Sequence, residues 1–403
     1  MQRVAMLSVH TSPLAQPGTG DGGGMNVYVR ALGSALARAG VAVDVLTRAE
    51  HAEQPPVVEV EPGFRVVHVP AGPCAPVPLR DLPGLVAAFT DASHRLLERR
   101  DGYDVLHANY WVSGAVGHRL KHELDLPLVT TFHTLDRVKA EVGLADGVPL
   151  RPRIEAEVVR CADLVVASTF EERDQLERHY GADPERVEVI APGVDHQVFF
   201  PGDRAAARRQ VGLPPGPVVL FVGRLQPLKG ADLAVRALAA LAERRATLVI
   251  VGGPSGPDGE AEARALRSLV ADLGLEHRVR FVDPQPHEHL ADYYRAADVC
   301  VVPSHTESFG LVALEASACG TPVVAAAVGG LRFLVDDGVT GHLVEARDPN
   351  AYAEVIDRVL RDDDDQMRAR AVARSTPYRW NIAAARLRRL YDDLAAHAPV
   401  KCS

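Results

Sequence analysis

The sequence has no surplus of positive charge and no hydrophobic run long enough to cross a membrane. Lys and Arg number 44 against 53 Asp and Glu, which gives a net charge of −9 and an isoelectric point near 6.0. Nucleic-acid-binding proteins usually carry a basic excess, so this balance argues against that class. No apolar stretch reaches the ~18 residues of a transmembrane helix, and no signal peptide precedes the first predicted strand. We expect a cytoplasmic protein, in which a local cationic pocket for a phosphate-bearing small molecule is still allowed.

Cysteine is also scarce. The five cysteines are odd in number and far apart in the sequence: Cys74, Cys161, Cys300, Cys319 and Cys402. Their spacing matches neither a disulfide framework nor a zinc site, so the sequence predicts reduced thiols in a cytoplasmic protein.

What the sequence has in abundance is short apolar runs that alternate with helical patterns. Such runs occur at Val4–Val9, Val41–Thr47, Phe64–Val69, Val105–His107, Leu128–Phe132, Leu164–Ser168, Val187–Ile190, Val218–Val222, Leu248–Val251, Val279–Val282, Val299–Pro303, Val323–Ala326 and His342–Val344. Strands without polar alternation are buried on both faces, which indicates parallel sheets covered by helices. We therefore predict an α/β protein of two doubly wound, Rossmann-like domains facing a central cleft, with ligands at the carboxyl ends of the strands.

The domain boundaries are predicted from breaks in these patterns. Pro and Gly at 191–193 and 201–202 interrupt both helix and strand, so we expect domains over residues 1–195 and 196–377. A final helical segment, 378–403, has one apolar face formed by Ile382, Ala385, Leu387, Leu390 and Leu394. It either caps its own domain or crosses back to the first. The acidic run Asp362–Asp365 is interpreted as a solvated loop rather than a metal site.

A glycine-rich segment over Gly18–Asn26 lies between the first predicted strand and helix. It formally matches the dinucleotide motif G-x-G-x-x-G, but seven residues separate His10 from Gly18, whereas that motif makes a tight turn. The sequence therefore disfavours a nicotinamide or flavin cofactor. The preferred interpretation is a loop whose amides approach an anion beside a helix N-terminus, and a purely structural turn is the alternative.

A cationic pair follows the first strand of the second half. Arg224 and Lys229 lie in Gly223–Gly230, just before a predicted helix. Arg as a fork and Lys as a point charge can together hold a diphosphate. The alternative is an ordinary surface pair.

A pair of carboxylates, Glu307 and Glu315, flanks the start of another predicted helix. The amides of residues 309–311 are unpaired first-turn donors that can meet oxygens of a sugar or a phosphate. One carboxylate can then hold a sugar hydroxyl and the other the ribose hydroxyls. The alternative is a Glu placed near the helix start for its favourable interaction with the helix dipole.

These motifs together resemble the retaining, family 4 glycosyltransferases, which have the GT-B fold and use nucleotide sugars. The resemblance rests on Glu307 and Glu315, on the Gly-Arg-Leu-x-x-x-Lys-Gly motif at 223–230 and on Gly23-Gly24. Further segments resemble the inositol-phosphate glycosyltransferases of mycothiol biosynthesis, which take N-acetylglucosamine from UDP. These segments are Met6–Tyr28, Tyr110–Trp111, His133–Thr134, Gly252–Pro257 and Asn381 onward.

The resemblance implies roles for individual residues. The donor site would comprise Gln16, Pro17, Gly23, Gly24, Arg224, Lys229, Gln285, Glu307, Ser308, Phe309, Gly310, Leu311 and Glu315. The acceptor site would comprise His10, Asp21, Gly22, Met25, Asn26, Arg80, Tyr110, Thr134 and Arg151. Catalysis would depend on Arg224, Lys229, Glu307 and His133, without a protein nucleophile, a catalytic metal or another cofactor. The resemblance also allows a homodimer and a structural Mg²⁺ near Tyr294, Arg295, Ala297 and Thr321.

Three positions depart from the family pattern. Leu79, next to Arg80, replaces a lysine for the acceptor phosphate, and no clean match exists for an arginine expected near 151–153. Gln285 replaces an arginine beside the nucleotide base. Losing a lysine at a phosphate site removes a contact worth about 1.5–3 kcal/mol. The acceptor is therefore left open between an inositol phosphate, a neutral cyclitol and a small thiol. The donor is left open between a UDP-sugar and a GDP-sugar, and the pathway between mycothiol and natural-product biosynthesis.

Two other classes of protein share the predicted architecture. A phosphorylase or epimerase would need a pyridoxal-binding lysine or would act on the nucleotide sugar without an acceptor. A non-catalytic binding protein would show no acceptor-dependent turnover. The motifs favour the transferase.

Overall fold

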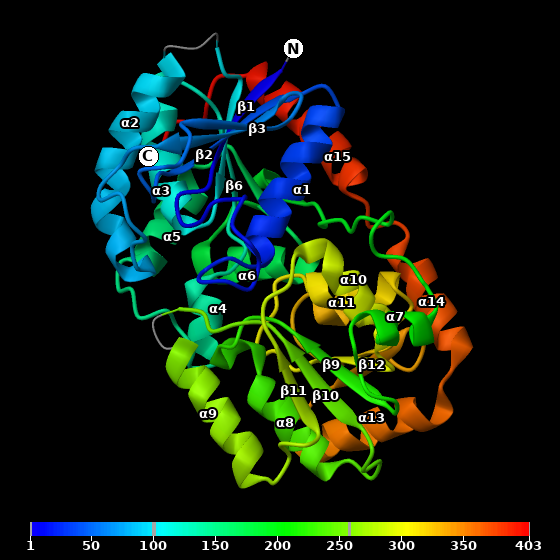
Figure 1. Ribbon diagram of the computed structural model, residues 1–403. Coiled ribbons are helices and arrows are strands. Elements are labelled where there is room, and N and C mark those ends of the chain that lie inside the picture. The colour runs from blue at the N-terminus through cyan, green and yellow to red at the C-terminus, as the bar shows by residue number, and fades with distance from the viewer. Residues whose placement is uncertain (1, 99–101, 257–258, 403) are drawn as a thin grey trace. The chain divides into compact units, whose positions relative to one another are not determined.

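The computed structural model describes residues 2–98, 102–256 and 259–402, and the chain divides into two compact units (Figure 1). Unit 1 comprises residues 1–15, 24–193 and 380–403, and unit 2 comprises residues 16–23 and 194–379. The short segment 16–23 thus joins unit 2, although the residues on either side of it belong to unit 1. We call this segment the glycine loop.

Unit 1 contains a sheet of eight strands in the order β3-β4-β2-β1-β5-β6-β7-β8. All neighbouring strands run parallel except β3 and β4, which are antiparallel. The order reverses between β1 and β5, which makes this the switch point where ligands of such sheets bind. The strands are β1 (Arg3–Leu7), β2 (Ala42–Arg48), β3 (Val57–Glu61), β4 (Phe64–Val69), β5 (Val105–Asn109), β6 (Leu128–Thr131), β7 (Leu164–Ala167) and β8 (Val187–Val189).

Helices cover both faces of this sheet because successive strand residues point to opposite sides. Val4 and Met6 of β1 pack in one core with α1 and α15, whereas Ala5 and Leu7 pack in the other with α2, α3, α5 and α6. The helices are α1 (Gly24–Arg38), α2 (Val86–Glu98), α3 (Trp111–Leu124), α4 (Asp136–Glu141), α5 (Arg151–Cys161), α6 (Phe170–Tyr180) and α15 (Trp380–Ala395), with single 3-10 turns η1 (Leu79–Leu85) and η2 (Pro184–Arg186).

Helix α15, shown in red in Figure 1, packs against α1 of unit 1. Tyr391 anchors it, because its hydroxyl lies 2.6 Å from Nδ1 of the buried His107 in β5. The predicted apolar face of this helix is confirmed at Leu387, Leu390 and Leu394, which pack against the core, and is wrong at Ile382 and Ala385. The buried residues are Ala383, Ala384, Leu387 and Tyr391, whereas Ile382 is exposed. The small side chains of Ala383 and Ala384 allow α15 to approach α1 closely. The helix therefore turns this face inward and leaves the larger Ile382 exposed.

Unit 2 contains a fully parallel sheet of six strands in the order β11-β10-β9-β12-β13-β14. Its switch point lies between β9 and β12. The strands are β9 (Val218–Val222), β10 (Thr247–Val251), β11 (Val279–Val282), β12 (Val299–Val302), β13 (Val323–Ala326) and β14 (Gly341–Val344). The helices are α7 (Arg204–Gln210), α8 (Ala231–Ala240), α9 (Gly259–Asp272), α10 (Leu290–Ala296), α11 (Leu311–Ala318), α12 (Leu331–Leu334), α13 (Pro349–Asp362) and α14 (Asp365–Ser375), with 3-10 turns η3 (Pro227–Lys229) and η4 (His287–His289).

The α/β fold class is confirmed, and every strand except β3 overlaps a predicted strand. Strand β3 escaped prediction because its glutamates and partial exposure are unlike the continuous apolar runs of the buried strands. The acidic run joins α13 to α14: Asp363 pairs with Arg204 and Arg368, and Asp364 caps α14. These carboxylates are occupied by structural interactions.

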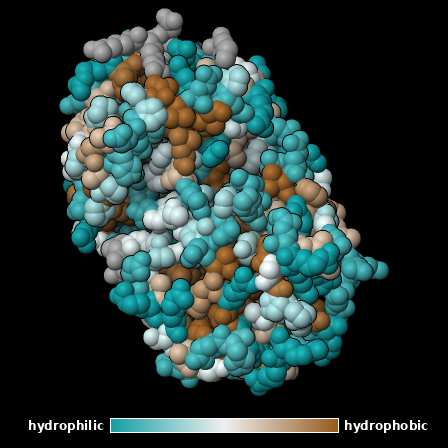
Figure 2. All heavy atoms as spheres, in the orientation of Figure 1, coloured by the Kyte–Doolittle hydropathy of each residue, from teal (hydrophilic) through white to brown (hydrophobic). Residues whose placement is uncertain are grey.

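The prediction that no cysteines are spaced for a disulfide is wrong. Cys161 and Cys402 form a disulfide with their Cα atoms 5.1 Å apart, although 241 residues separate them in the sequence. Residues 380–402 return to unit 1, and local spacing could not reveal this proximity. Within the described residues, no helix combines the length and the apolar content that crossing a membrane requires. The face seen in Figure 2 is mostly hydrophilic, with smaller apolar areas between the polar side chains.

Candidate functional site

The first part of the site is the loop that follows β9, at the switch point of unit 2. The strand ends at Val222, and the chain passes Arg224 before η3 ends at Lys229. Gly230 then starts α8 with a φ of 71°, and a Cβ at this position would lie 2.2 Å from the carbonyl oxygen of Pro303. Only glycine allows this close approach. The two predicted cations therefore lie at the carboxyl end of the strand, beside the loop that follows β12.

Glu307 lies in that neighbouring loop and contacts Lys229 directly. Its Oε2 accepts hydrogen bonds from Lys229 Nζ at 2.7 Å and from Ser304 Oγ at 3.2 Å. The backbone of Glu307 is held from the other side, because its carbonyl oxygen accepts from the amide of Gly330 at 2.8 Å. The structure therefore brings the predicted Lys229 and Glu307 together and fixes the carboxylate through contacts that the motif did not reveal.

Ser308, Phe309, Gly310 and Leu311 connect Glu307 to α11. Gly310 adopts a φ of 106° and precedes the helix, which begins at Leu311. The first-turn amides of a helix lack intrahelical partners and carry the positive end of the helix dipole. A helix N-terminus with such first-turn amides thus lies directly beyond Glu307.

Arg224 contacts the glycine loop. Its Nη1 donates to Ser255 Oγ at 3.0 Å and to the carbonyl oxygen of Asp21 at 3.4 Å. A Cβ at Gly23 would lie only 3.0 Å from Arg224 Nε. Because Gly23 has no Cβ, the backbone of the glycine loop can lie close to the Arg224 guanidinium group.

The rest of the glycine loop is held by residues that follow β11. Gln16 Nε2 donates to the carbonyl oxygen of Pro284 at 2.9 Å. Gln285 lies next to this contact, and its Nε2 donates to the Asp283 carbonyl oxygen at 2.9 Å. Pro17, Asp21 and Gly22 belong to the same loop and therefore to unit 2. Asp21 and Gly22 were predicted as acceptor residues, yet the structure places their loop beside Arg224, which was predicted as a donor residue. Pro257 of the resembling segment lies outside the described residues.

Glu315 is almost fully buried on α11 and has a partner for each carboxylate oxygen. Oε1 lies 2.7 Å from His287 Nε2, and Oε2 accepts from the Tyr294 hydroxyl at 2.9 Å. Burial, reinforced by Glu315, raises the pKa of Tyr294 well above its usual value, so the phenol stays protonated and donates. Sequence reasoning missed His287, because its turn carries no motif and only the fold places it beside α11.

In unit 1, three predicted acceptor-side residues form one cluster, in which Arg151 contacts both Tyr110 and Thr134. The guanidinium donates to the Tyr110 hydroxyl at 3.0 Å, to the Thr134 carbonyl oxygen at 2.7 Å and to Thr134 Oγ1 at 3.1 Å. Arg151 is 0% exposed and also pairs with Glu155 at 2.7 Å and with Asp146. Burial opposes ionisation of Asp146, but Arg151 and Lys139 outweigh it and hold the pKa of that carboxyl below its usual value. The charge of Arg151 is therefore compensated within the protein.

Tyr110 and His133 share an unusual backbone conformation. They follow β5 and β6 with φ values of 76° and 63°, a region that residues other than glycine rarely adopt. His133 lies edge to face on Tyr28 with ring centroids 4.8 Å apart, and its Nε2 lies 3.0 Å from Asn109 Oδ1. Burial, helped by His107, lowers the pKa of His133 to about 3, so its imidazole is neutral at pH 7. Strained residues at strand ends are typical of functional sites.

Of the remaining predicted residues of unit 1, some lie near the carboxyl end of β1 and one, Arg80, is exposed elsewhere. The His10 ring lies 5.2 Å from the Tyr110 ring, and Asn26 Nδ2 donates to Thr11 Oγ1 at 2.9 Å, both near the carboxyl end of β1. Gly24 and Met25 begin α1, and Met25 packs against the core. Arg80 instead is exposed on η1 beside Asp81 at 3.9 Å, and Leu79 packs against the core. The structure describes no contact that brings Arg80 into the Arg151 cluster.

The residues expected near a structural Mg²⁺ do not fit that ion. Mg²⁺ in proteins is usually bound through carboxylates and waters. Tyr294, Arg295, Ala297 and Thr321 offer only neutral oxygens, and the Thr321 hydroxyl already donates to the Tyr294 carbonyl oxygen at 2.6 Å.

Comparison with known proteins identifies the family. Residues 22–198 match the family "Glycosyltransferase Family 4", and residues 203–376 match "Glycosyl transferases group 1". The D-inositol 3-phosphate glycosyltransferase of Xylanimonas cellulosilytica is 50% identical, over 99% of this chain and 98% of that protein. The enzyme of the same name from Geodermatophilus obscurus is 53% identical, over 89% and 82%. The chain belongs to this glycosyltransferase family.

Solved structures agree with this assignment. The sucrose-phosphate synthase of Thermosynechococcus elongatus has a TM-score of 0.92 and is 38% identical, covering 98% of this chain and 100% of that one. HepE of Anabaena, in complex with UDP and glucose, has a TM-score of 0.79 at 24% identity over 98% and 100%, which shows a common fold. The resemblance stated from the sequence is confirmed: the chain is a nucleotide-sugar glycosyltransferase with the GT-B fold.

Proposed function

We propose that this glycosyltransferase moves a hexose-type sugar, N-acetylglucosamine by resemblance, from a UDP-sugar to an inositol phosphate with retention of the anomeric configuration. The observation that carries the donor side is the contact between Lys229 and Glu307, in the loops that follow β9 and β12, with Arg224 in the same loop as Lys229. The acceptor class is supported by relatives about half identical to this chain that are named D-inositol 3-phosphate glycosyltransferases.

The donor would lie along the loops of unit 2. The diphosphate fits Arg224 and Lys229, with the amides of the glycine loop and the start of α11 as further donors. Lys229 has three N–H donors, so it can hold Glu307 and a phosphate oxygen together. Glu315 retains lone pairs for ribose hydroxyls after its contacts with His287 and Tyr294, and Glu307 faces the sugar.

The reaction would depend on charge stabilisation. As the glycosidic bond to the diphosphate breaks, negative charge grows on the leaving phosphate beside Arg224 and Lys229. The acceptor oxygen attacks from the same face, and a phosphate oxygen of the leaving group takes its proton. Each carboxylate of the site has a binding role, so no protein nucleophile is assigned. His133, kept neutral by burial, would donate to or accept from a sugar hydroxyl.

On the acceptor side, His10, Asn26, Tyr110 and Thr134 would contact the polyol. Arg151 would act through its neighbours, since its side chain is buried and orients Tyr110 and Thr134. It is a positioning residue in this proposal.

The burial and charge compensation of Arg151 favour a second candidate function, in which the acceptor is a non-phosphorylated cyclitol. Arg151 is neutralised by Asp146 and Glu155, and Leu79 is apolar. Among the predicted acceptor residues, Arg80 is then the exposed cation that could meet a phosphate.

An acceptor panel separates the two candidates. UDP release from UDP-N-acetylglucosamine is measured with inositol 3-phosphate, inositol 1-phosphate and free inositol, and the anomeric configuration of the product is determined by NMR. We expect release only with inositol 3-phosphate and an α-linked product. Turnover with free inositol alone would establish the second candidate, and release of UDP without any acceptor would contradict both.

A donor panel of UDP and GDP sugars tests the base beside Gln285 in the same assay. We expect turnover with UDP sugars. A homodimer and a cytoplasmic location stay predictions from the sequence.

A further inference from the structure

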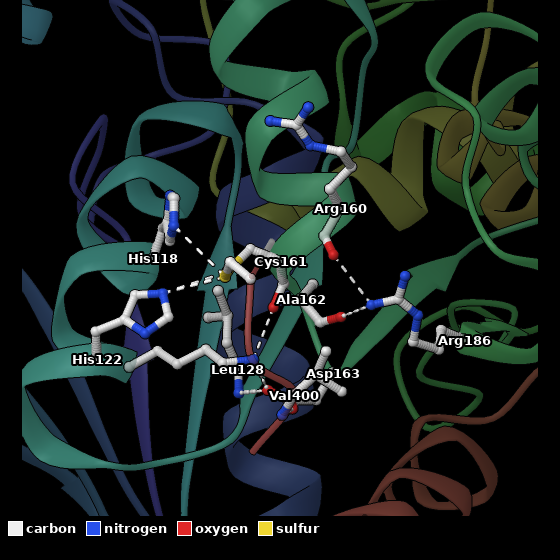
Figure 3. The surroundings of a disulfide bond; sticks show 11 residues. His118, His122, Leu128, Arg160, Cys161, Ala162, Asp163, Arg186 and Val400 are labelled. Atoms are coloured by element: carbon white, nitrogen blue, oxygen red, sulfur yellow. Dashed lines mark hydrogen bonds and ion pairs between the residues drawn. A yellow bond between two sulfur atoms is a disulfide. The ribbon is translucent and has the colours of Figure 1, made fainter.

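Four side chains with metal-binding chemistry converge in unit 1, and none of them belongs to the residues proposed for sugar transfer. His118 and His122 lie on α3, Cys161 ends α5, and Cys402 follows α15. Figure 3 shows the side chains of His118 and His122 near Cys161. One potential ligand atom from each of the four lies within 4.8 Å of all the others. Residues 118, 122, 161 and 402, here named the His2Cys2 cluster, come from three segments that are remote in sequence.

The distances within the cluster are close to those of a tetrahedral zinc site. His122 Nε2 lies 3.1 Å from Cys402 Sγ and 3.3 Å from Cys161 Sγ, and His118 Nε2 lies 3.8 Å from Cys402 Sγ. Zinc bonds of about 2.0–2.1 Å to nitrogen and about 2.3 Å to sulfur place tetrahedral ligands roughly 3.3–3.8 Å apart. A thiol reductant that supplies two electrons and two protons, and is itself oxidised to a disulfide, would convert the Cys161–Cys402 disulfide into two thiols, and the two sulfurs could then move to that separation.

The fold positions the four residues through local and long-range contacts. His118 and His122 are four residues apart on α3, so their side chains lie on one face of the helix, with ring centroids 5.3 Å apart. The buried Lys121 of the same helix donates to the Cys161 carbonyl oxygen at 2.7 Å and pairs with Asp163 at 2.6 Å. Asp163 also accepts from the amide of Val400 at 2.5 Å. One buried ion pair thus holds both cysteine-bearing segments against α3.

We propose that the His2Cys2 cluster binds one Zn²⁺ when its two cysteines are reduced, and that the disulfide is its metal-free form. On binding, both thiols release their protons, and two thiolates and two neutral imidazoles donate to the metal. Two thiolates with two imidazoles in tetrahedral geometry favour zinc among the common divalent ions. Four protein ligands leave no open position for water, so the ion is structural and fastens the segment after α15 to α3 and α5.

The test is a metal titration of the full chain, reduced and stripped with a chelator. Co²⁺ serves as the spectroscopic probe, because tetrahedral thiolate coordination gives intense visible and charge-transfer absorption, and Zn²⁺ is then used to displace it. The variants are Cys402→Ser and His122→Ala, both at exposed positions, so loss of binding does not arise from a disrupted core. Cys74→Ser, an exposed cysteine outside the cluster, is the matched control.

We expect one equivalent of Co²⁺ in the wild-type chain and in Cys74→Ser, displaced by one equivalent of Zn²⁺. Removing one of four ligands should weaken binding by about 100-fold in Cys402→Ser and His122→Ala. A reduced wild-type chain that binds no stoichiometric Co²⁺ or Zn²⁺ would overturn the proposal and leave the cysteines as a disulfide only. Unchanged binding in both variants would overturn it as well. Neither readout depends on sugar transfer.

Discussion

Two arginines, one in each unit, are substrate-binding candidates from the sequence, and their surroundings are opposite. Arg224 is partly exposed and contacts neutral oxygens, the Ser255 hydroxyl and the Asp21 carbonyl. Arg151 is fully buried and pairs with Asp146 and Glu155. A buried guanidinium that already has two carboxylates has little charge to offer a ligand, whereas the partly exposed Arg224 follows β9 at the edge of the sheet where ligands of such folds bind. The sequence makes both arginines candidates for contact with a substrate, and the packing shows that their surroundings differ.

The largest expected effect is on stability in unit 1. Arg151→Met leaves the carboxylates of Asp146 and Glu155 without their buried partner, which should cost about 3–5 kcal/mol of unfolding free energy. Urea unfolding measures this loss. Arg153→Met is the matched control, because Arg153 is 79% exposed and its pair with Glu157 is worth at most about 1 kcal/mol. Equal midpoints for the two variants would show that the Arg151 network contributes no stability.

The next effect is on turnover in unit 2. Lys229→Met removes a cation that stabilises the leaving diphosphate, so kcat should fall about 100- to 1000-fold, as when an oxyanion donor is lost. The fold should remain intact, since Lys229 is 26% exposed. Steady-state kinetics measure the change, with Arg236→Met on the exposed side of α8 as the control. A variant that keeps wild-type kcat would refute the assignment of Lys229.

A smaller effect is expected at Glu315. Glu315→Gln replaces a charged acceptor of the ribose hydroxyls, which should raise the Kd for UDP about 10- to 100-fold. Calorimetric titration with UDP measures it. Glu354→Gln, on the exposed side of α13, should bind like the wild type. If Glu315→Gln did so too, the ribose would have to be placed elsewhere.

The smallest effect is the pH dependence of the free energy of unfolding. It extends the comparison of the two units, because the groups concerned are buried in unit 1. Burial lowers the pKa of His107 and His133 to about 3, below the usual 6.5, so the unfolded chain binds their protons first as the pH falls. Their stabilisation is therefore lost progressively below pH 6.5. Burial raises the pKa of Glu172 to about 7, which acts in the opposite direction between pH 4.5 and 7.

These three groups together contribute a net loss of about 1–2 kcal/mol between pH 6.5 and 5. Urea unfolding at the two pH values measures this change. His107→Gln should reduce the measured loss by about 1–2 kcal/mol, because the contribution of one buried histidine is then removed. An unchanged pH dependence in that variant would show that His107 is not the group that titrates.

How far the sequence predicts the molecule can be followed at particular residues. Continuous apolar runs such as Val299–Val302 predict parallel strands, since burial on both faces leaves no polar alternation. Arg224, Lys229 and Glu307 could be placed together because the carboxyl ends of neighbouring parallel strands meet at one edge of a sheet. These predictions rest on periodicity and on strand direction, which local sequence encodes.

Apart from strand β3, the features that escaped prediction depend on tertiary contacts. The sequence does not reveal that the glycine loop belongs to unit 2, because only its contacts with Arg224 and Pro284 show this. The burial of Arg151 and the pairing of Cys161 with Cys402 likewise depend on distant segments. His287 became a candidate only once the fold placed it beside Glu315.

The central claim is that the nucleotide diphosphate is held by Arg224 and Lys229. Thermal unfolding with and without UDP tests it most directly, because a ligand at 100 times its Kd stabilises the folded state by about 2.7 kcal/mol. At one UDP concentration, the wild type and Arg153→Met should gain that stabilisation, and Arg224→Met and Lys229→Met should lose most of it. Full stabilisation by UDP in both unit 2 variants would contradict the claim.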